Sequence, residues 1–338
     1  IVFGDWSSDV CSSDLDGFLI AGQTGLMVEG QRLNGGSFSW EERSPSARNW
    51  LFDMVWVTNL YVAVGDRGTV MTSAEGVDWD VEVVPEGLAS TVLLGVGGTT
   101  NLLVAAGSQG SLMISPNAVT NLVWTNDFGT VITQELSTLG LVWHAVEPRP
   151  VTNDLQGVTF HAGRHYLSGG AGTILSSADG SEWSVHQAPT TKFLSGIAGF
   201  PGGLVAVGDD GAMVFSAMGD DWVALPELTT NWLYRVRYLN GALLAVGQGG
   251  VIYASTNAVT WEPRVSGTTQ WLNDVSWVDG HYYVAGTQGT VLRSSDGLVW
   301  TSLGTITAKS LMLSPPTVVA CSPRGSRASL SEPRWYQI

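Results

Sequence analysis

The feature that most constrains the fold of this chain is a repeat of about 39 residues. A Gly-x-x-Gly tetrapeptide occurs in every copy, and a tryptophan follows it. The tetrapeptides begin at Gly22, Gly65, Gly107, Gly169, Gly208, Gly247 and Gly286, and the tryptophans are Trp40, Trp79, Trp124, Trp183, Trp222, Trp261 and Trp300. A unit this small cannot bury its own apolar surface, so the repeats are expected to stack on one another.

The repeat from residue 271 to residue 300 predicts four short strands. We expect strands at Leu272 to Val278, His281 to Ala285 and Thr290 to Arg293, with a fourth beginning at Trp300. The pair Asp279-Gly280 and the Gly-x-x-Gly tetrapeptide suit tight turns, where glycine supplies a positive φ. Four antiparallel strands repeated radially describe a propeller blade. The predicted fold is all-β, a seven-bladed β-propeller with four-stranded antiparallel blades, in which the recurrent tryptophans pack between blades.

The two ends of the chain depart from the repeat. Residues 4 to 15 (GDWSSDVCSSDL) resemble translated sequencing-adapter sequence found at the ends of environmental gene fragments, so residues 1 to 15 are left out of the fold prediction. The propeller is expected over residues 16 to 314, and residues 315 to 338 are expected to be an irregular tail or linker. Counting one repeat forward from Trp271 reaches Ser310, so residues 310 to 314 are predicted to supply the inner strand of the first blade.

The turn before each tryptophan carries a family resemblance. It reads SADGSEW at Ser177 to Trp183 and SSDGLVW at Ser294 to Trp300, with weaker copies ending at Trp79, Trp222 and Trp261. These turns resemble the Asp-box of sialidase-type BNR repeats, with one residue fewer between Asp and Trp. With V-A-V-G-x-x-G ahead of the box, the unit is similar to the propeller family that includes the photosystem II assembly and stability factors. The resemblance implies the fold but no single function.

The sequence offers no assignable catalytic set. The arginines are scattered, so the three-arginine site of sialidases cannot be placed, and the cleft between two propellers used by some glucan hydrolases is absent. The acid pairs Asp209-Asp210 and Asp220-Asp221 are adjacent residues, which on a strand face opposite ways and suit glycoside hydrolysis poorly. The five histidines share no metal-ligand spacing. We therefore expect no enzyme activity, no metal and no cofactor.

Composition limits the partners. The formal charge is −15, from 30 acidic and 15 basic residues, which disfavours binding to nucleic acids. No apolar run approaches the roughly 20 residues of a membrane-spanning helix. The first hypothesis is a non-catalytic scaffold for ligand binding or protein assembly, located outside the cell or in a bacterial periplasm. The alternatives are a glycoside-active BNR enzyme and one module of a larger secreted, adhesin-like protein.

The predicted binding surface is the face that carries the Gly-x-x-Gly turns. In a four-stranded blade this turn lies on the same face as the link to the next blade, and several links end in an aromatic residue. Variable polar turns above a rigid repeat commonly carry recognition. The candidate ligand-binding residues are Trp50, Asp66, Arg67, Gln109, Trp143, Phe193, Asp209, Asp210, Trp232, Gln248, Trp271 and Gln288. The expected partner is a protein, a peptide or a glycan. Alternatively, these aromatic side chains are buried wedges between blades. The ligand and the oligomeric state are left open.

Overall fold

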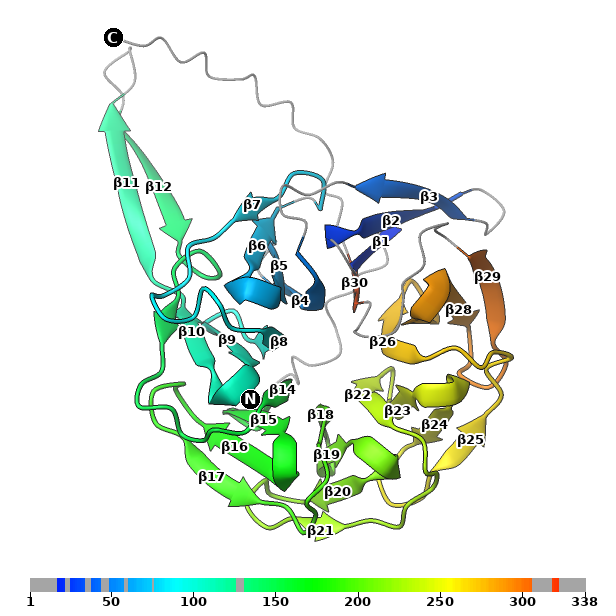
Figure 1. Ribbon diagram of the computed structural model, residues 1–338. Coiled ribbons are helices and arrows are strands. Elements are labelled where there is room, and N and C mark those ends of the chain that lie inside the picture. Colours follow the sequence, from blue (N-terminus) through cyan, green and yellow to red (C-terminus); the bar gives the residue numbers. More distant parts are fainter. Residues whose placement is uncertain are drawn as a thin grey trace, which may run out of the picture.

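The chain forms an all-β ring of radially arranged sheets, as Figure 1 shows. The structure is a computed structural model that describes residues 17–21, 25–33, 38–43, 49–57, 60–74, 76–125, 131–305 and 318–321. Each sheet is antiparallel, and the six sheets formed from one continuous stretch of chain have their first strand nearest the centre of the ring (Figure 1). The predicted all-β propeller with four-stranded antiparallel blades is confirmed.

Six blades are each formed from one continuous stretch of chain. Their strands are β4 (Leu51–Val57), β5 (Leu60–Gly65), β6 (Val70–Ser73) and β7 (Asp80–Val81); β8 (Leu93–Gly98), β9 (Leu102–Gly107), β10 (Leu112–Pro116) and β13 (His144–Ala145); β14 (Leu155–His161), β15 (Arg164–Gly169), β16 (Thr173–Ser177) and β17 (Ser184–Gln187); β18 (Gly196–Phe200), β19 (Gly203–Val207), β20 (Met213–Ser216) and β21 (Val223–Ala224); β22 (Leu233–Leu239), β23 (Ala242–Gly247), β24 (Ile252–Ser255) and β25 (Glu262–Arg264); and β26 (Leu272–Val278), β27 (His281–Gly286), β28 (Thr290–Ser294) and β29 (Thr301–Thr305).

A further sheet combines the two ends of the described chain. Strands β1 (Gly17–Ala21), β2 (Met27–Arg32) and β3 (Phe38–Arg43) are followed in space, on the inner side of β1, by β30 (Val318–Cys321). β30 pairs antiparallel with β1 and lies next to both β26 and β4. The described chain has six continuous blades rather than the predicted seven, and the remaining four-stranded sheet is composite. Residues 310–314 lie outside the described residues, and β30 falls within the predicted tail.

The apolar side chains form clusters that each span two neighbouring blades. One cluster joins Val62 and Val64 of β5 to Leu103 of β9 and to Trp143, and another joins Val246 of β23 to the next blade and Trp300. Trp79, Trp222 and Trp261 occupy the corresponding position in three further clusters, and Trp183 packs against a sixth. Successive side chains of a strand point to opposite faces, so strands with consecutive apolar residues, such as β5 and β9, bury both faces of their sheets. The predicted packing role is confirmed for Trp79, Trp183, Trp222, Trp261 and Trp300, whereas Trp143 is not among the tryptophans predicted to pack between blades.

The box turn, the link from the third to the fourth strand of a blade, has a similar geometry in the six continuous blades, although the indole N–H of Trp300 has no hydrogen-bond partner among the described residues. In the blade of β14–β17, the Ser177 hydroxyl accepts the Gly180 backbone N–H at 2.8 Å, and the Trp183 indole N–H donates to the Gly180 carbonyl at 2.8 Å. The same pair of bonds recurs at Trp79, Trp222 and, without the hydroxyl bond, Trp261. These bonds anchor each tryptophan against the preceding blade.

The prediction for the third repeat is wrong on one point. Trp143, not Trp124, fills the box position: its indole N–H donates to the Gly140 carbonyl at 2.7 Å, and Ser115 accepts the Gly140 N–H at 2.7 Å. Between Ser115 and Gly140 the chain forms the hairpin β11 (Val119–Thr125) and β12 (Val131–Ser137), which projects away from the ring in Figure 1. The insertion therefore leaves from the box-turn face, not from the predicted binding face.

Candidate functional site

Six Gly-x-x-Gly turns line one face of the ring. Each contains a short 3-10 turn: η2 (Asp66–Gly68), η3 (Ser108–Gly110), η4 (Gly170–Gly172), η5 (Asp209–Gly211), η6 (Gln248–Gly250) and η7 (Thr287–Gly289). The first residue of each turn donates its N–H to a carbonyl that lies one to three residues before an inner strand, as Gln248 does to Trp232 at 2.9 Å. The turns therefore fix the residues that lead into the inner strands.

The two glycines of the tetrapeptide have different roles. The first is extended, with φ −178° at Gly247, so the expected positive φ is wrong for this position. A Cβ on Gly247 would lie 1.9 Å from the Trp232 carbonyl oxygen, so only glycine permits the close approach. The last glycine does have positive φ, as does the residue before it, for example Asp210 at 48°. Backbone geometry thus sets both glycines and leaves the two middle side chains free to vary.

Three aromatic side chains predicted for the binding face form a continuous arc. The ring centroids of Phe193 and Trp232 are 6.1 Å apart, and those of Trp232 and Trp271 are also 6.1 Å apart. All three are half-buried. The Trp232 indole N–H donates to Ser195 at 2.9 Å, which fixes its orientation, and Tyr234 extends the contact inward. We call Phe193, Trp232 and Trp271 the aromatic arc.

The other predicted ligand-binding residues lie outside the aromatic arc. Trp50 is half-buried and precedes β4, on the far side of the composite sheet from Trp271. Five of the six turns hold the predicted polar residues: the side chains of Arg67, Gln109, Asp210 and Gln288 are exposed, and those of Asp66, Asp209 and Gln248 are half-buried. Trp143 is buried on the other face, so its assignment to the binding face is a mistake.

A second polar site, absent from the prediction, lies at the centre of the ring, in the region that the inner strands surround and that we call the channel (Figure 1). Five of the six inner strands of the continuous blades have a bulge after their first residue, and the same position follows it in each. That position holds Asp53, Gly95, Gly157, Gly196, Arg235 and Asp274 on β4, β8, β14, β18, β22 and β26. We call β8, β14 and β18 the glycine side of the ring, and β22, β26 and β4 the charged side.

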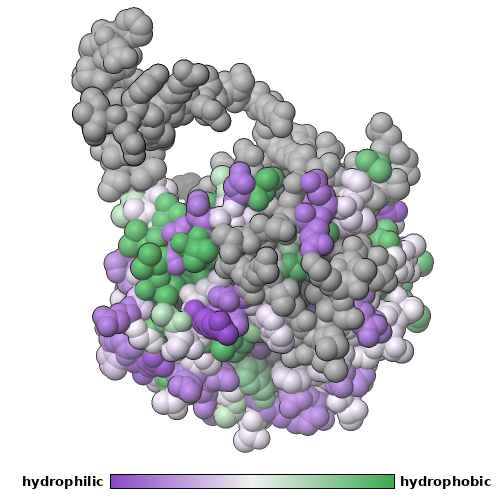
Figure 2. Space-filling view, turned by 45° about the horizontal axis from the view of Figure 1, so that its top comes forward, coloured by the Kyte–Doolittle hydropathy of each residue, from purple (hydrophilic) through white to green (hydrophobic). Residues whose placement is uncertain are grey.

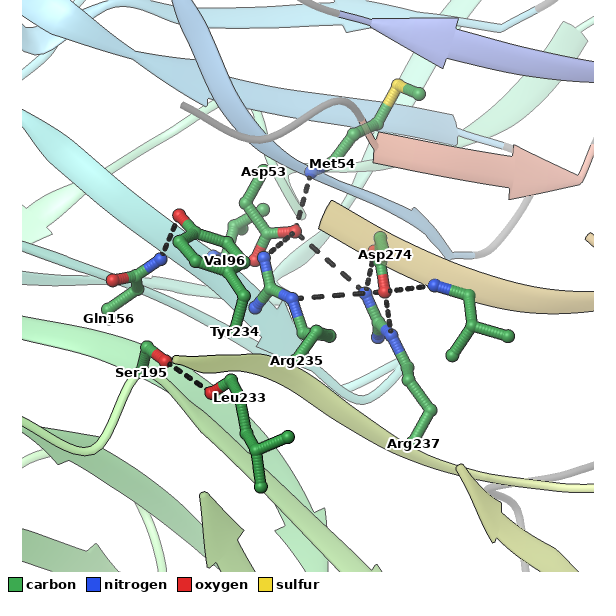
Figure 3. Close-up of polar contacts among 11 residues, drawn as sticks. Asp53, Met54, Val96, Gln156, Ser195, Leu233, Tyr234, Arg235, Arg237 and Asp274 are labelled. Atoms are coloured by element: carbon green, nitrogen blue, oxygen red, sulfur yellow. Dashed lines mark hydrogen bonds and ion pairs between the residues drawn. The ribbon is translucent and has the colours of Figure 1, made fainter. Parts of the chain in front are cut away.

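The charged side converges on an ion cluster, shown in Figure 3. Arg237 of β22 makes two hydrogen bonds to the Asp274 carboxylate, at 2.9 and 2.6 Å. Arg235 lies between the two acids, 3.5 Å from Asp53 and 3.8 Å from Asp274. Asp53 also accepts the Val96 N–H at 3.0 Å, which links its blade to the next. The two arginines therefore connect blades on either side of the composite sheet.

Burial and charge act against each other in this cluster. Burial raises the pKa of Asp53, and the two arginines oppose that rise. Burial alone would lower the pKa of Arg237, but Asp274 outweighs it and raises the value. Tyr234, which accepts a hydrogen bond from Gln156, has a pKa raised to about 12 by burial. With two acids and two bases the cluster is formally neutral, as a buried charge group must be to persist.

Sequence reasoning missed the cluster although a pattern was available. The six inner strands align as L-F-D-M, L-L-G-V, L-Q-G-V, L-S-G-I, L-Y-R-V and L-N-D-V, so one column holds only glycine or a charged residue. A charged residue within an otherwise apolar strand indicates a polar partner. The aligned repeats therefore contained this signal, but the ion pair between Arg235 of β22 and Asp53 of β4 forms only in the closed ring.

The structure brings together no catalytic constellation among the described residues. The Asp209-Asp210 pair lies in a Gly-x-x-Gly turn and Asp220-Asp221 in a box turn. His165 is buried beside Phe160, and burial lowers its pKa to about 4. In the described ranges no three His, Cys, Asp or Glu side chains are grouped for a metal. Within the same ranges, no helix has the length and apolar character needed to cross a bilayer.

Exposed apolar side chains are found mainly at the periphery. Those at box turns are Val77, Leu141, Val142, Met218, Val259, Leu298 and Val299, and those on or just after outer strands are Val81, Val83, Val185, Val223 and Val265. In the view of Figure 2, the largest hydrophobic patch lies at the left, and the other coloured parts of the surface mix hydrophilic groups with groups of intermediate hydropathy. The aromatic arc is thus distinct from the peripheral apolar side chains in being half-buried and fixed in orientation.

Comparison with known proteins agrees on the fold. No family model matches the chain, and no curated protein matches its sequence. The fold is similar to that of YCF48 bound to D1 peptide, with a TM-score of 0.61 and 17% identity over 81% of this chain and 86% of that one. YCF48 from Cyanidioschyzon merolae gives a TM-score of 0.55 and 16% identity over 75% and 85%. The WD40 propeller domain of Doa1 gives 0.60 and 10% over 85% and 93%. The chain therefore resembles YCF48 in fold.

Proposed function

We propose that this chain is a non-catalytic propeller scaffold that binds a peptide segment of a partner protein on the face of the Gly-x-x-Gly turns. The aromatic arc carries the proposal. Its three rings are half-buried, in mutual contact and held by backbone bonds to the turns. Rigid aromatic side chains provide contact area at a small cost in conformational entropy, which is why they dominate binding surfaces.

Two further observations support this proposal. The first is that a similar fold has been solved with a bound peptide. The second is that the described polar clusters suit structure better than catalysis: the channel arginines are already paired with carboxylates, and Ser176, which contacts His186 at 2.9 Å, is fully buried. A nucleophile without access to substrate cannot act. A glycan is the alternative ligand for the same aromatic surface.

We also propose that the composite sheet acts as the seventh blade. β30 occupies the inner position between β26 and β4, where an inner strand of the ring belongs. A strand from the far end of the chain that pairs with β1 covers the edge that β1 would otherwise expose. The repeat spacing predicts the inner strand of this blade at residues 310 to 314, whereas β30 spans Val318–Cys321.

A display selection of short random peptides tests the proposed function. We expect enriched peptides whose binding is lost in Trp271→Leu and retained in Trp183→Leu. Both tryptophans are half-buried, but Trp183 lies in a box turn on the opposite face. Thermal unfolding of each variant establishes that it is folded. The proposal is overturned if the selection enriches no peptide, or if only Trp183→Leu abolishes binding.

A further inference from the structure

The charges on the face that carries the aromatic arc are predominantly acidic. In the described turns and links of this face there are eight carboxylates and three basic side chains. The acids are Asp66, Glu82, Glu86, Glu147, Asp154, Asp209, Asp210 and Glu227, and the bases are Arg67, Arg149 and Lys192. A surface with this excess attracts cationic segments and repels anionic ones.

The base closest in sequence to the arc is already neutralised. The Lys192 ammonium donates to the Glu227 carboxylate at 2.8 Å and lies 3.9 Å from the Asp210 carboxylate. The hydrogen bond to Glu227 raises the pKa of Lys192, so it stays charged and paired. Asp210 keeps 65% of its side chain exposed, and Asp209 stands beside it. The net charge next to Phe193 is therefore negative.

The tryptophan rings of the aromatic arc also favour a cationic partner. Tryptophan is the best aromatic acceptor for a cation placed over its face, and an ammonium or guanidinium group lies there favourably. Trp232 and Trp271 meet at 60°, so their faces do not lie against each other, and neither ring is fully buried. Acids at the rim of an aromatic surface add long-range attraction to this short-range preference.

We propose that the aromatic arc and the Asp209-Asp210 pair together select a basic peptide segment, with lysine or arginine side chains over the tryptophan rings. This inference rests on the proposed peptide-binding function and specifies its ligand chemistry. Apolar residues of the same segment would contact Phe193. The chain supplies an internal comparison, because a second acid pair, Asp220-Asp221, belongs to the same blade and lies on the opposite face.

The test uses two labelled synthetic peptides that share their leucine and proline positions and carry either lysine or glutamate elsewhere. Fluorescence anisotropy should show the lysine peptide binding about tenfold more tightly, with the advantage shrinking as salt is raised. The double variant D209N/D210N should weaken lysine-peptide binding about three- to tenfold, while D220N/D221N leaves it unchanged. Asparagine tolerates the positive φ of Asp210, so the turn is preserved.

Three results would overturn the inference. Equal or tighter binding of the glutamate peptide, still lost in Trp271→Leu, rejects the basic ligand and leaves the peptide-binding function intact. Equal effects of the two acid-pair variants mean that only the overall negative charge attracts the peptide. Absence of binding by either peptide up to about 1 mM rejects the stated chemistry, and the display selection then decides the proposed function separately.

Discussion

The glycine side and the charged side of the ring share one backbone and differ in what fills the channel. On the glycine side, a Cβ at Gly95 would lie 1.9 Å from the Gln156 carbonyl oxygen of the next inner strand, so the strands are in direct backbone contact. On the charged side, Arg235, Asp274 and Asp53 occupy the equivalent position and pair across the channel. One repeat unit thus accommodates two solutions to the same packing problem, tight backbone approach and a compensated ion cluster.

The largest expected effect is on the charged side. Arg235→Met removes the guanidinium between Asp53 and Asp274 and leaves buried carboxylates under-compensated, so unfolding free energy should fall by about 3–5 kcal/mol. Urea unfolding measures the loss. Arg149→Met is the control, because Arg149 pairs with an exposed Glu147 and should change stability by less than about 1 kcal/mol. An Arg235→Met protein as stable as the wild type would show that the cluster does not hold this side together.

A second prediction contrasts the pH responses of the two sides. His165, in the β14–β17 blade, has a pKa lowered to about 4 from 6.5, so the folded state binds fewer protons than the unfolded state between these values. Stability should therefore fall as pH drops from about 6.5 to 4, by at most about 3 kcal/mol. Asp53, with a raised pKa, acts in the opposite direction, because its contribution falls as pH rises through the folded pKa.

Unfolding experiments at a series of pH values separate these contributions. His165→Leu should lose most of the acid sensitivity between pH 6.5 and 4, whereas His144→Leu, at an exposed position on β13, should keep it. If both variants follow the wild-type curve, the buried histidine does not set the acid response.

The smallest of the stability predictions concerns the glycine side. Gly95→Ala forces β8 away from β14 and should cost about 1–3 kcal/mol, typical of an overpacked site. Gly170→Ala is the control, since its Cβ would meet Asn153 only at an ordinary 3.5 Å, and its effect should stay within about 0.5 kcal/mol. Thermal unfolding compares the two. Equal losses of stability in Gly95→Ala and Gly170→Ala would mean that the close approach of β8 and β14 does not require glycine at position 95.

The repeat predicted most of the fold because its turn chemistry is local. The strands expected over residues 272–293 match β26, β27 and β28 within one residue. The third repeat failed because the hairpin splits its box turn, and Trp124 sits at nearly the expected distance. Yet the sequence STLGLVW, ending at Trp143, copies SSDGLVW, ending at Trp300, apart from two residues. The pairing of β30 with β1 has no such local pattern, because the two strands are far apart in the sequence.

The candidate site could be predicted only in part for a similar reason. The position of Trp232 and Trp271 before their strands follows from the repeat, but their mutual contact requires neighbouring blades at fixed spacing. The link between Arg235 and Asp53 crosses the channel between blades that are remote in sequence. Side-chain convergence at the centre of a ring is a property of the closed structure rather than of any one repeat.

The most direct measurement determines which face of the propeller binds the lysine peptide. With 5-fluorotryptophan incorporated, fluorine NMR reports on tryptophans of both faces while the lysine peptide is added. The account predicts that the resonances of Trp232 and Trp271, assigned by single substitutions, shift in a saturable manner, while those of the box-turn residues Trp79, Trp183 and Trp222 do not. Shifts confined to the box-turn tryptophans would contradict it and place the binding surface on the opposite face of the propeller.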